Sequence, residues 1–184
     1  MNMTVLALLA ALAAPMAHAV EYRSVLPKQS TIHFEFRQMG VPVKGGFRRF
    51  STEMLFDPAK PEAARARIEI DLASIDAGSP EADEESAGRL WFNRSVYPEA
   101  AFVASQVRAL GNNRYELRGT LTLKGRSREM VVPVAYTAGR NAASFDGSFV
   151  LKRLDFGIGE GMWADVATVA NEVKVTFRIA ATGN

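Results

Sequence analysis

The chain has 184 residues, with 22 Lys or Arg against 20 Asp or Glu, so its formal net charge is only +2. No basic cluster exceeds two adjacent residues, which excludes the electrostatic footprint of a nucleic-acid-binding protein. The chain contains no cysteine, which excludes thiol nucleophiles, lipobox acylation and thiolate metal sites.

The N-terminal segment "MNMTVLALLAALAAPMAHA" is apolar and ends in Ala17-His18-Ala19. Small residues at both ends of that triplet fit a signal-peptidase site, so we predict a signal peptide over residues 1–19 and a mature chain starting at Val20. The alternative is a buried N-terminal helix. A signal peptide implies export, so we predict a periplasmic protein. Residues 20–184 have the length of one domain.

Five segments alternate apolar and polar residues with a period of two, which is typical of antiparallel strands with one face in water. In chain order they are "TIHFEF" (31–36), "ARIEIDL" (66–72), "YELRGTLTL" (115–123), "SFDGSFVL" (144–151) and "EVKVTFRI" (172–179). Turn residues separate them at 56–61, 111–113, 124–126 and 138–142. The pattern predicts an all-β domain of about eight or nine strands, either a sandwich or a closed barrel.

Two segments between the strands do not alternate. Residues 80–93 open on Ser79-Pro80 and carry four acidic residues before Trp91 and Phe92, which predicts one short helix. Residues 156–171 carry glycines and Trp163. We interpret these two segments as the aromatic mouth of a barrel. The alternative is that Trp91 and Phe92 plug the barrel as ordinary core.

Five pieces of the chain carry a resemblance to a known family. They are "STIHFEFRQMGVPVKGGFRRF" (30–50), "IDLASIDAG" (70–78), "WFNRSVYPEAAFVAS" (91–105), "GTLTLKGRSREMVVPV" (119–134) and "LKRLDFGIG" (151–159). In this order they resemble the YceI-like family of periplasmic polyisoprenoid-binding proteins, which have a lipocalin-like antiparallel barrel. The chain departs from the family form at two places. Gln38 stands where many members carry a histidine, in the segment before the "KGGF" turn (44–47), and the loop from Met39 to Gly45 is a residue shorter than the common form and holds Pro42.

The resemblance implies a carrier that holds an isoprenoid, a quinone-like lipid or another long amphiphile inside the barrel. Burial of each CH₂ contributes about 0.8 kcal/mol, so a long tail is a strong source of affinity. The inward residues that would form the pocket wall are Phe34, Phe36, Ile68, Ile70, Phe102, Leu117, Leu121, Phe145 and Phe149. Plain barrel core is the alternative for each of them.

The candidate mouth residues are Trp91, Phe92 and Trp163. The candidate head-group contacts are Arg37, Gln38, Arg153 and Asp155, because Arg binds phosphate and Gln can hydrogen-bond a quinone or amide carbonyl. A surface pair is the alternative for Arg153 and Asp155.

Catalysis and metal binding are not expected. The glycines of "FGIGEG" (156–161) lack the Lys-Ser/Thr ending of a phosphate loop and are interpreted as tight turns. His33, the sole histidine after residue 19, lies on the polar face of its strand, away from any nucleophile elbow.

We therefore expect a non-catalytic periplasmic lipid carrier without a permanent cofactor. A membrane redox protein and a second copy of the chain are further candidate partners. Two other functions stay open. One is an enzyme or accessory factor acting on isoprenoid lipids or quinones beside a membrane redox protein. The other is a stress-response protein with a filled barrel.

Overall fold

The computed structural model describes residues 20–183, which form one eleven-stranded antiparallel sheet and one α-helix, α1 (Pro80–Ala87). The strands are β1 (Tyr22–Val25), β2 (Thr31–Gln38), β3 (Val41–Phe47), β4 (Phe50–Leu55), β5 (Arg65–Asp71), β6 (Ile75–Asp76), β7 (Glu99–Gly111), β8 (Arg114–Leu123), β9 (Arg126–Thr137), β10 (Ala143–Lys152) and β11 (Glu172–Gly183). Short 3-10 helices lie at η1 (Pro27–Gln29), η2 (Pro61–Ala63), η3 (Leu72–Ser74), η4 (Arg153–Phe156) and η5 (Gly161–Trp163). The all-β prediction is confirmed, whereas the predicted signal peptide at 1–19 lies outside the described residues.

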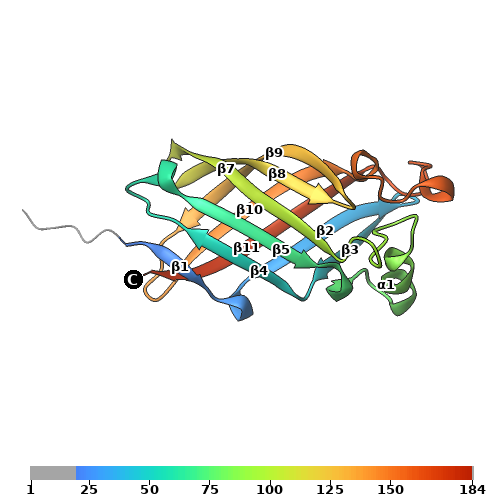
Figure 1. The fold of residues 1–184 in the computed structure, drawn as a ribbon, viewed down its shortest axis with the longest axis horizontal. Coiled ribbons are helices and arrows are strands. Elements are labelled where there is room, and N and C mark those ends of the chain that lie inside the picture. Colours follow the sequence, from blue (N-terminus) through green and yellow to red (C-terminus); the bar gives the residue numbers. More distant parts are fainter. Residues whose placement is uncertain (1–19, 184) are drawn as a thin grey trace, which may run out of the picture.

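The sheet curls round into a barrel. Neighbouring strands follow the order β4-β5-β7-β8-β9-β10-β11-β2-β3-β6, and β1 pairs with β11 beside β2. The two end strands, β4 and β6, continue β3 and β5 along the chain after short bends. If β1–β2, β3–β4 and β5–β6 are each counted as one bent strand, the eleven strands become eight around the barrel. Figure 1 shows the resulting long barrel, with α1 at one end and β1 towards the other.

Two ion pairs hold the bend between β3 and β4. Arg48 Nη2 lies 2.6 Å from Asp76 Oδ2, and Arg49 Nη2 lies 2.7 Å from Asp71 Oδ2. The Ser74 hydroxyl accepts a hydrogen bond from the Arg49 backbone N–H at 2.9 Å. The bond from Arg49, helped by the backbone N–H of Ala73, lowers the pKa of the Asp71 carboxyl. These contacts join the bend between β3 and β4 to the facing bend between β5 and β6.

The strand register places the predicted apolar faces inside the barrel. Phe102 is paired with Leu121 across β7 and β8, and Phe145 is paired with Ile179 across β10 and β11. Paired residues in an antiparallel sheet project from the same face, so each of these pairs shares the interior. His33 is exposed on the outer face, as predicted.

Aromatic side chains fill one end of the barrel. The cluster consists of Tyr22, Phe56, Tyr115, Tyr136 and Phe145, whose ring centroids lie 5.1 to 6.5 Å from their neighbours. The hydroxyls of Tyr22 and Tyr136 lie 2.9 Å apart, and burial together with this hydrogen bond raises the pKa of Tyr136. Tyr22 and Phe56 also exchange two backbone hydrogen bonds, of 2.8 and 3.1 Å, which join β1 to the end of β4. We call this end the closed end.

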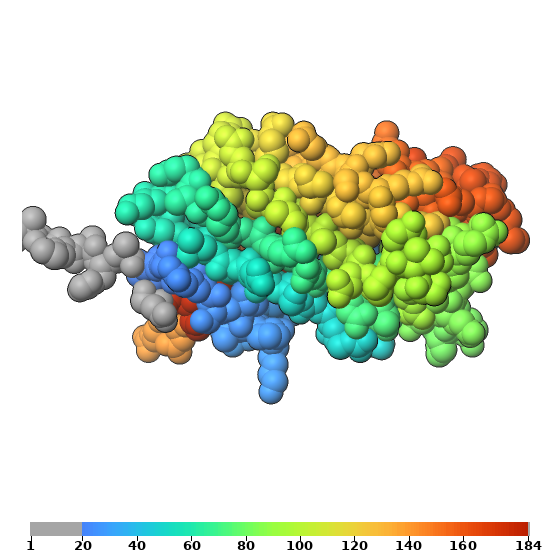
Figure 2. Space-filling view, viewed as in Figure 1, coloured from blue at the N-terminus to red at the C-terminus, as the bar shows by residue number. Residues whose placement is uncertain are grey.

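The opposite end is formed by α1 and the connection between β10 and β11. In the space-filling view the green segment that contains α1 and the orange-red segment after β10 cover the end opposite β1 (Figure 2). Within residues 20–183, no helix combines the length and apolar character needed to span a membrane. We call this end the mouth.

Two predicted boundaries are wrong. The helix ends at Ala87 rather than near residue 93, because the backbone at Gly88 turns to extended values (φ −64°, ψ 164°). Most of the predicted loop from Met39 to Gly45, together with the "KGGF" turn, is instead strand β3 (Val41–Phe47). Met39 and Gly40 alone make the turn between β2 and β3, with φ values of 48° and 79°. The left-handed backbone suits a two-residue hairpin, because it matches the twist of the strands.

Candidate ligand-binding site

A cavity of about 490 Å³ lies inside the mouth half of the barrel. Its wall is largely apolar, and it reaches the surface beside the exposed residues Glu81 and Glu85. A second cavity of about 120 Å³ lies deeper, towards the closed end. The two cavities have five lining residues in common, which are Ile32, Ile70, Leu121, Phe149 and Val175. The space is therefore elongated along the barrel, as a chain-like molecule requires.

Every residue predicted for the pocket wall or the mouth lines one of these cavities, and so do two of the four predicted head-group contacts, Gln38 and Arg153. The larger cavity alone is lined by Phe34, Phe36, Gln38, Trp91, Phe92, Arg153 and Trp163. The deeper cavity alone is lined by Ile68, Phe102, Leu117 and Phe145. Both are lined by Ile70, Leu121 and Phe149. Contact of these residues with a ligand stays a prediction, but their position on the inner wall is a property of the fold.

Phenylalanine rings lie against glycines of a neighbouring strand on this inner wall. A Cβ atom built on Gly119 would lie 2.6 Å from Cζ of Phe102, which is closer than real Cβ contacts allow. Phe177 covers Gly147 in the same manner, and Phe34 covers Gly45. A ring that occupies the missing side chain's place lies along the wall instead of projecting into the lumen. These pairs therefore help keep the barrel hollow although its wall is rich in phenylalanine.

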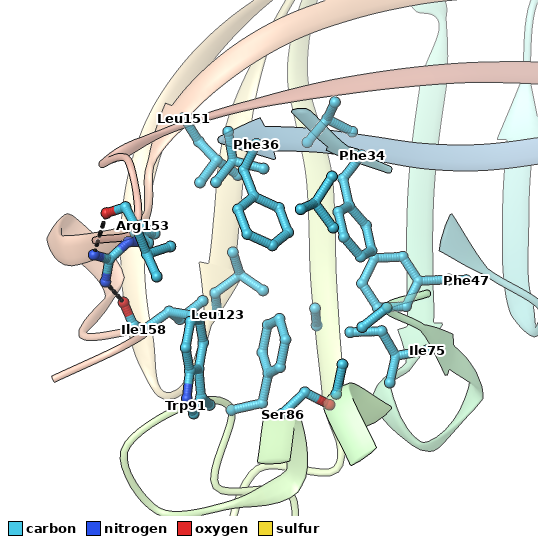
Figure 3. A pocket seen from close by; sticks show the side chains of 18 of the residues that line it. Phe34, Phe36, Phe47, Ile75, Ser86, Trp91, Leu123, Leu151, Arg153 and Ile158 are labelled. Carbon is cyan, nitrogen blue, oxygen red and sulfur yellow. Dashed lines mark hydrogen bonds between the residues drawn. The ribbon is translucent and has the colours of Figure 1, made fainter. Parts of the chain in front are cut away.

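Two tryptophans meet at the mouth. The ring centroids of Trp91 and Trp163 lie 5.6 Å apart, and the Trp163 indole Nε1 donates to Glu85 Oε1 of α1 at 3.0 Å. Figure 3 shows Trp91 on the wall of the cavity, opposite Phe34 and Phe47. Both tryptophans lie at the end of the barrel where the sequence predicted the mouth, and their contact with a ligand stays a prediction.

Arg153 forms hydrogen bonds to the loop between β10 and β11 that shapes the mouth. Its side chain is buried, with 2% of the residue exposed, and its Cζ lies 5.9 Å from the centre of the Trp91 ring. All five of its N–H groups donate to backbone carbonyls, at 2.6 to 3.1 Å, which belong to Ile158, Gly159, Trp163, Val169 and Ala170. Figure 3 shows the guanidinium beside Trp91 and bonded to Ile158.

The guanidinium of Arg153 has no N–H left for a ligand head group. Both sequence interpretations, a head-group contact or a surface pair with Asp155, miss this arrangement. An arginine after a strand gives no signal that a distant loop will fold around it. Burial lowers the pKa of Arg153, yet arginine stays charged in proteins, so the five carbonyl dipoles compensate a buried positive charge. Arg37 and Asp155 are exposed and line neither cavity.

The glycines of "FGIGEG" allow this loop to wrap around Arg153. Gly157, Gly159 and Gly161 have φ values of 66°, 74° and 63°, which residues with a Cβ rarely adopt. The interpretation of these glycines as tight turns is confirmed. Lys124 in the β8–β9 turn donates to the Gly157 carbonyl at 2.5 Å and to Glu160 at 3.1 Å, which ties the loop to the barrel wall.

The polar groups that face the cavity at the mouth include an amide, a hydroxyl, two carboxylates and the indole N–H of Trp91. Trp91 Nε1 is buried and, like the side-chain amide of Gln38, has no hydrogen-bond partner among residues 20–183. Ser86 Oγ donates to the Asp83 carbonyl at 2.6 Å, and Glu81 and Glu85 extend from the helix α1 beside it. Hydrogen bonds from its own backbone N–H and from Ser79 lower the pKa of Glu81. The sequence indicated these carboxylates as charges in the first helical turn, and gave no signal that they border a cavity.

Comparison with known proteins agrees with this geometry. The model of the YceI-like domain matches residues 24–181. The chain belongs to the YceI-like family. A relative, the UPF0312 protein of Azotobacter vinelandii, is 28% identical over 180 residues, which cover 92% of this chain and 91% of the relative. A UPF0312 protein of Pseudomonas savastanoi is 30% identical over 159 residues, covering 81% of this chain and 82% of its own.

Solved structures share the barrel of this YceI-like chain. The crystal structure of BcnA from Burkholderia cenocepacia superposes with a TM-score of 0.84 at 38% identity, and covers 86% of this chain and 100% of its own. A polyisoprenoid binding domain from Saccharophagus degradans, implicated in plant cell wall breakdown, has a TM-score of 0.67 at 15% identity and covers 91% of this chain. The lipocalin-like barrel implied by the sequence resemblance is confirmed.

Proposed function

We propose that this YceI-like protein binds a long-chain amphiphilic lipid, an isoprenoid or a quinone-like lipid, inside its barrel and carries it through the periplasm. The observation that carries the proposal is the apolar cavity of about 490 Å³, which continues into a deeper one. Ten buried CH₂ groups would contribute about 8 kcal/mol before the cost of ordering the chain. The Saccharophagus degradans structure is that of a polyisoprenoid binding domain, which supports the same ligand class.

The charges and hydrogen-bond donors at the mouth favour a ligand with an uncharged head group over one with a phosphate. The carboxylates of Glu81 and Glu85 border the cavity and would repel an anion, while Arg153 has committed all five N–H groups to the protein. The unpartnered amide of Gln38 could donate to a quinone or amide carbonyl. These groups bind and orient a ligand but offer no nucleophile–base pair, so we propose binding without chemistry. Delivery to a membrane redox protein and pairing with a second copy stay predictions.

The deciding experiment is native mass spectrometry of protein taken from the periplasm, followed by solvent extraction of any bound molecule. We expect one isoprenoid or quinone-like lipid per chain. The presence of the protein in that fraction also tests the proposed location. An empty protein that refuses added isoprenoids would overturn the carrier proposal.

A matched pair of variants in β10 tests where the lipid binds. Phe149 lines both cavities, whereas its neighbour Val150 points outward and is 53% exposed. We expect Phe149→Arg to lose the lipid because it places a charge in the apolar lumen. Val150→Arg should keep the lipid. Circular dichroism would show whether both variants stay folded, and loss of lipid from both would contradict the assignment of the lumen.

A further inference from the structure

The rim of the mouth carries large apolar side chains that lie in solvent. Met162 and Met39 are 77% and 73% exposed, the highest values for large apolar residues within 20–183, and Val41 and Val166 are 63% and 53% exposed. We call these four residues the rim patch. Isolated exposed apolar residues are ordinary, but a group beside a binding cavity indicates an interaction surface.

The rim patch is built on two segments that hydrogen bonds hold together. Met39 lies in the β2–β3 turn and Val41 is the first residue of β3, while Met162 and Val166 lie in the loop between β10 and β11. The Met39 backbone N–H donates to the Thr168 carbonyl at 2.8 Å, and the Ala170 N–H donates to the Arg37 carbonyl at 2.8 Å. The patch is therefore formed before any partner arrives, and binding would not have to order it.

The patch borders the cavity directly. Gln38 and Trp163, which line the cavity, are the sequence neighbours of Met39 and Met162. A long lipid tail that leaves the cavity at this rim passes next to apolar side chains. The rim patch could then shield the tail from water if it were pressed against a lipid phase.

Arg37 is the cation that the patch offers to a lipid surface. Its side chain is exposed, forms no ion pair among residues 20–183, and donates through Nη1 to the Gly40 carbonyl at 2.8 Å, which leaves other N–H groups for a phosphate. Lys44 Nζ, in contrast, lies 3.7 Å from Glu35 Oε2. Asp165 lies within the patch, and Glu81 and Glu85 lie on the α1 side of the mouth. The β2–β3 side of the rim therefore presents a basic group beside apolar side chains that can enter the interface.

We infer that the rim patch docks the mouth of the barrel onto the surface of a phospholipid bilayer. The inference rests on the proposed function, because a lipid carrier must exchange its cargo with a membrane. The unbranched methionines suit this surface, since flexible thioether side chains adapt to an irregular partner. Insertion places the cavity opening at the level of the acyl chains, so the lipid tail can pass without crossing water.

Vesicles and two double variants test the docking. The chain has two tryptophans, Trp91 and Trp163, and both lie at the mouth, so their fluorescence reports its position. With vesicles of phosphatidylethanolamine and phosphatidylglycerol whose acyl chains carry bromine, we expect quenching of the wild-type emission and co-flotation of the protein. Met39→Glu with Met162→Glu should weaken vesicle binding by about tenfold or more, given the apolar burial that it removes. The control, Leu110→Glu with Val131→Glu, changes residues of 48% and 46% exposure away from the mouth and should bind as wild type.

Farnesol in vesicle-free solution separates this inference from the proposed function. We expect the rim variant to bind farnesol as wild type does, because the cavity wall is unchanged. A wild-type protein that binds farnesol but not vesicles would overturn the docking and leave the proposed function standing. A protein that binds vesicles but not farnesol would overturn the proposed function alone. Equal losses in the rim and control variants would overturn the docking. A vesicle-free dimer that only the rim substitutions dissociate would overturn it as well, because the patch would then pair two copies.

Discussion

Replacement of Arg153 by lysine tests how the mouth is held together. The five N–H groups of Arg153 donate hydrogen bonds to five backbone carbonyls, whereas a lysine ammonium has only three N–H donors. At least two carbonyls of the mouth loop would therefore lose their partner. An unsatisfied buried polar group costs about 1–3 kcal/mol, so we expect Arg153→Lys to reduce the free energy of unfolding by about 2–6 kcal/mol. A domain has about 5–15 kcal/mol in total, so the loss is large.

Urea unfolding, followed by tryptophan fluorescence and by far-UV circular dichroism, measures this loss. Trp91 and Trp163 report the mouth, while the dichroism reports the whole sheet. The control is Lys152→Met, which removes the charge of an exposed neighbour and should change the free energy of unfolding by no more than about 0.5 kcal/mol. If Arg153→Lys were no less stable than this control, the carbonyl bonds would not hold the mouth and our reasoning would be wrong.

Three further predictions concern the wall and the bend. Gly147→Ala should push the Phe177 ring out of its place, lower the free energy of unfolding by about 1–3 kcal/mol in urea titration and reduce dye uptake by the barrel. Phe102→Arg should abolish lipid uptake, measured by extraction and mass spectrometry; unchanged uptake in a folded variant would contradict the pocket assignment. The bond from Arg49 lowers the pKa of Asp71 below its ordinary 3.8, so the stabilisation is complete above pH 3.8 and is lost as the pH falls through the lowered pKa. Arg49→Ala should raise that pKa towards 3.8 in an NMR titration, and an unchanged value would show that the Ala73 N–H is the main cause.

The sequence by itself determined which side of each strand faces inward. Alternation with a period of two decides this locally, because successive side chains of a strand point to opposite faces. Phe34, Phe102 and Phe149 could thus be assigned to the interior without coordinates. The turns at Asn112 and Lys124 were also readable, because their residues suit a two-residue hairpin. The closed barrel was predicted from the resemblance to the YceI-like family, since the alternation alone also allowed a sandwich.

Only the tertiary structure decided that the barrel is hollow at one end and filled at the other. Alternation says nothing about how far apart opposite walls lie, because strand number and stagger set the width of a barrel. The aromatic cluster around Tyr22 and the rings that lie over glycines arise from contacts between strands distant in the sequence.

The role of Arg153 was also decided by tertiary structure. Its five carbonyl partners lie 5 to 17 residues further along the chain, and they converge only when the loop folds back over the barrel. From the sequence, a charged residue after a strand is expected at the surface, because burial of an unpaired charge is costly. Here the backbone dipoles of the mouth compensate the charge, and no local pattern of residues records where those dipoles will point.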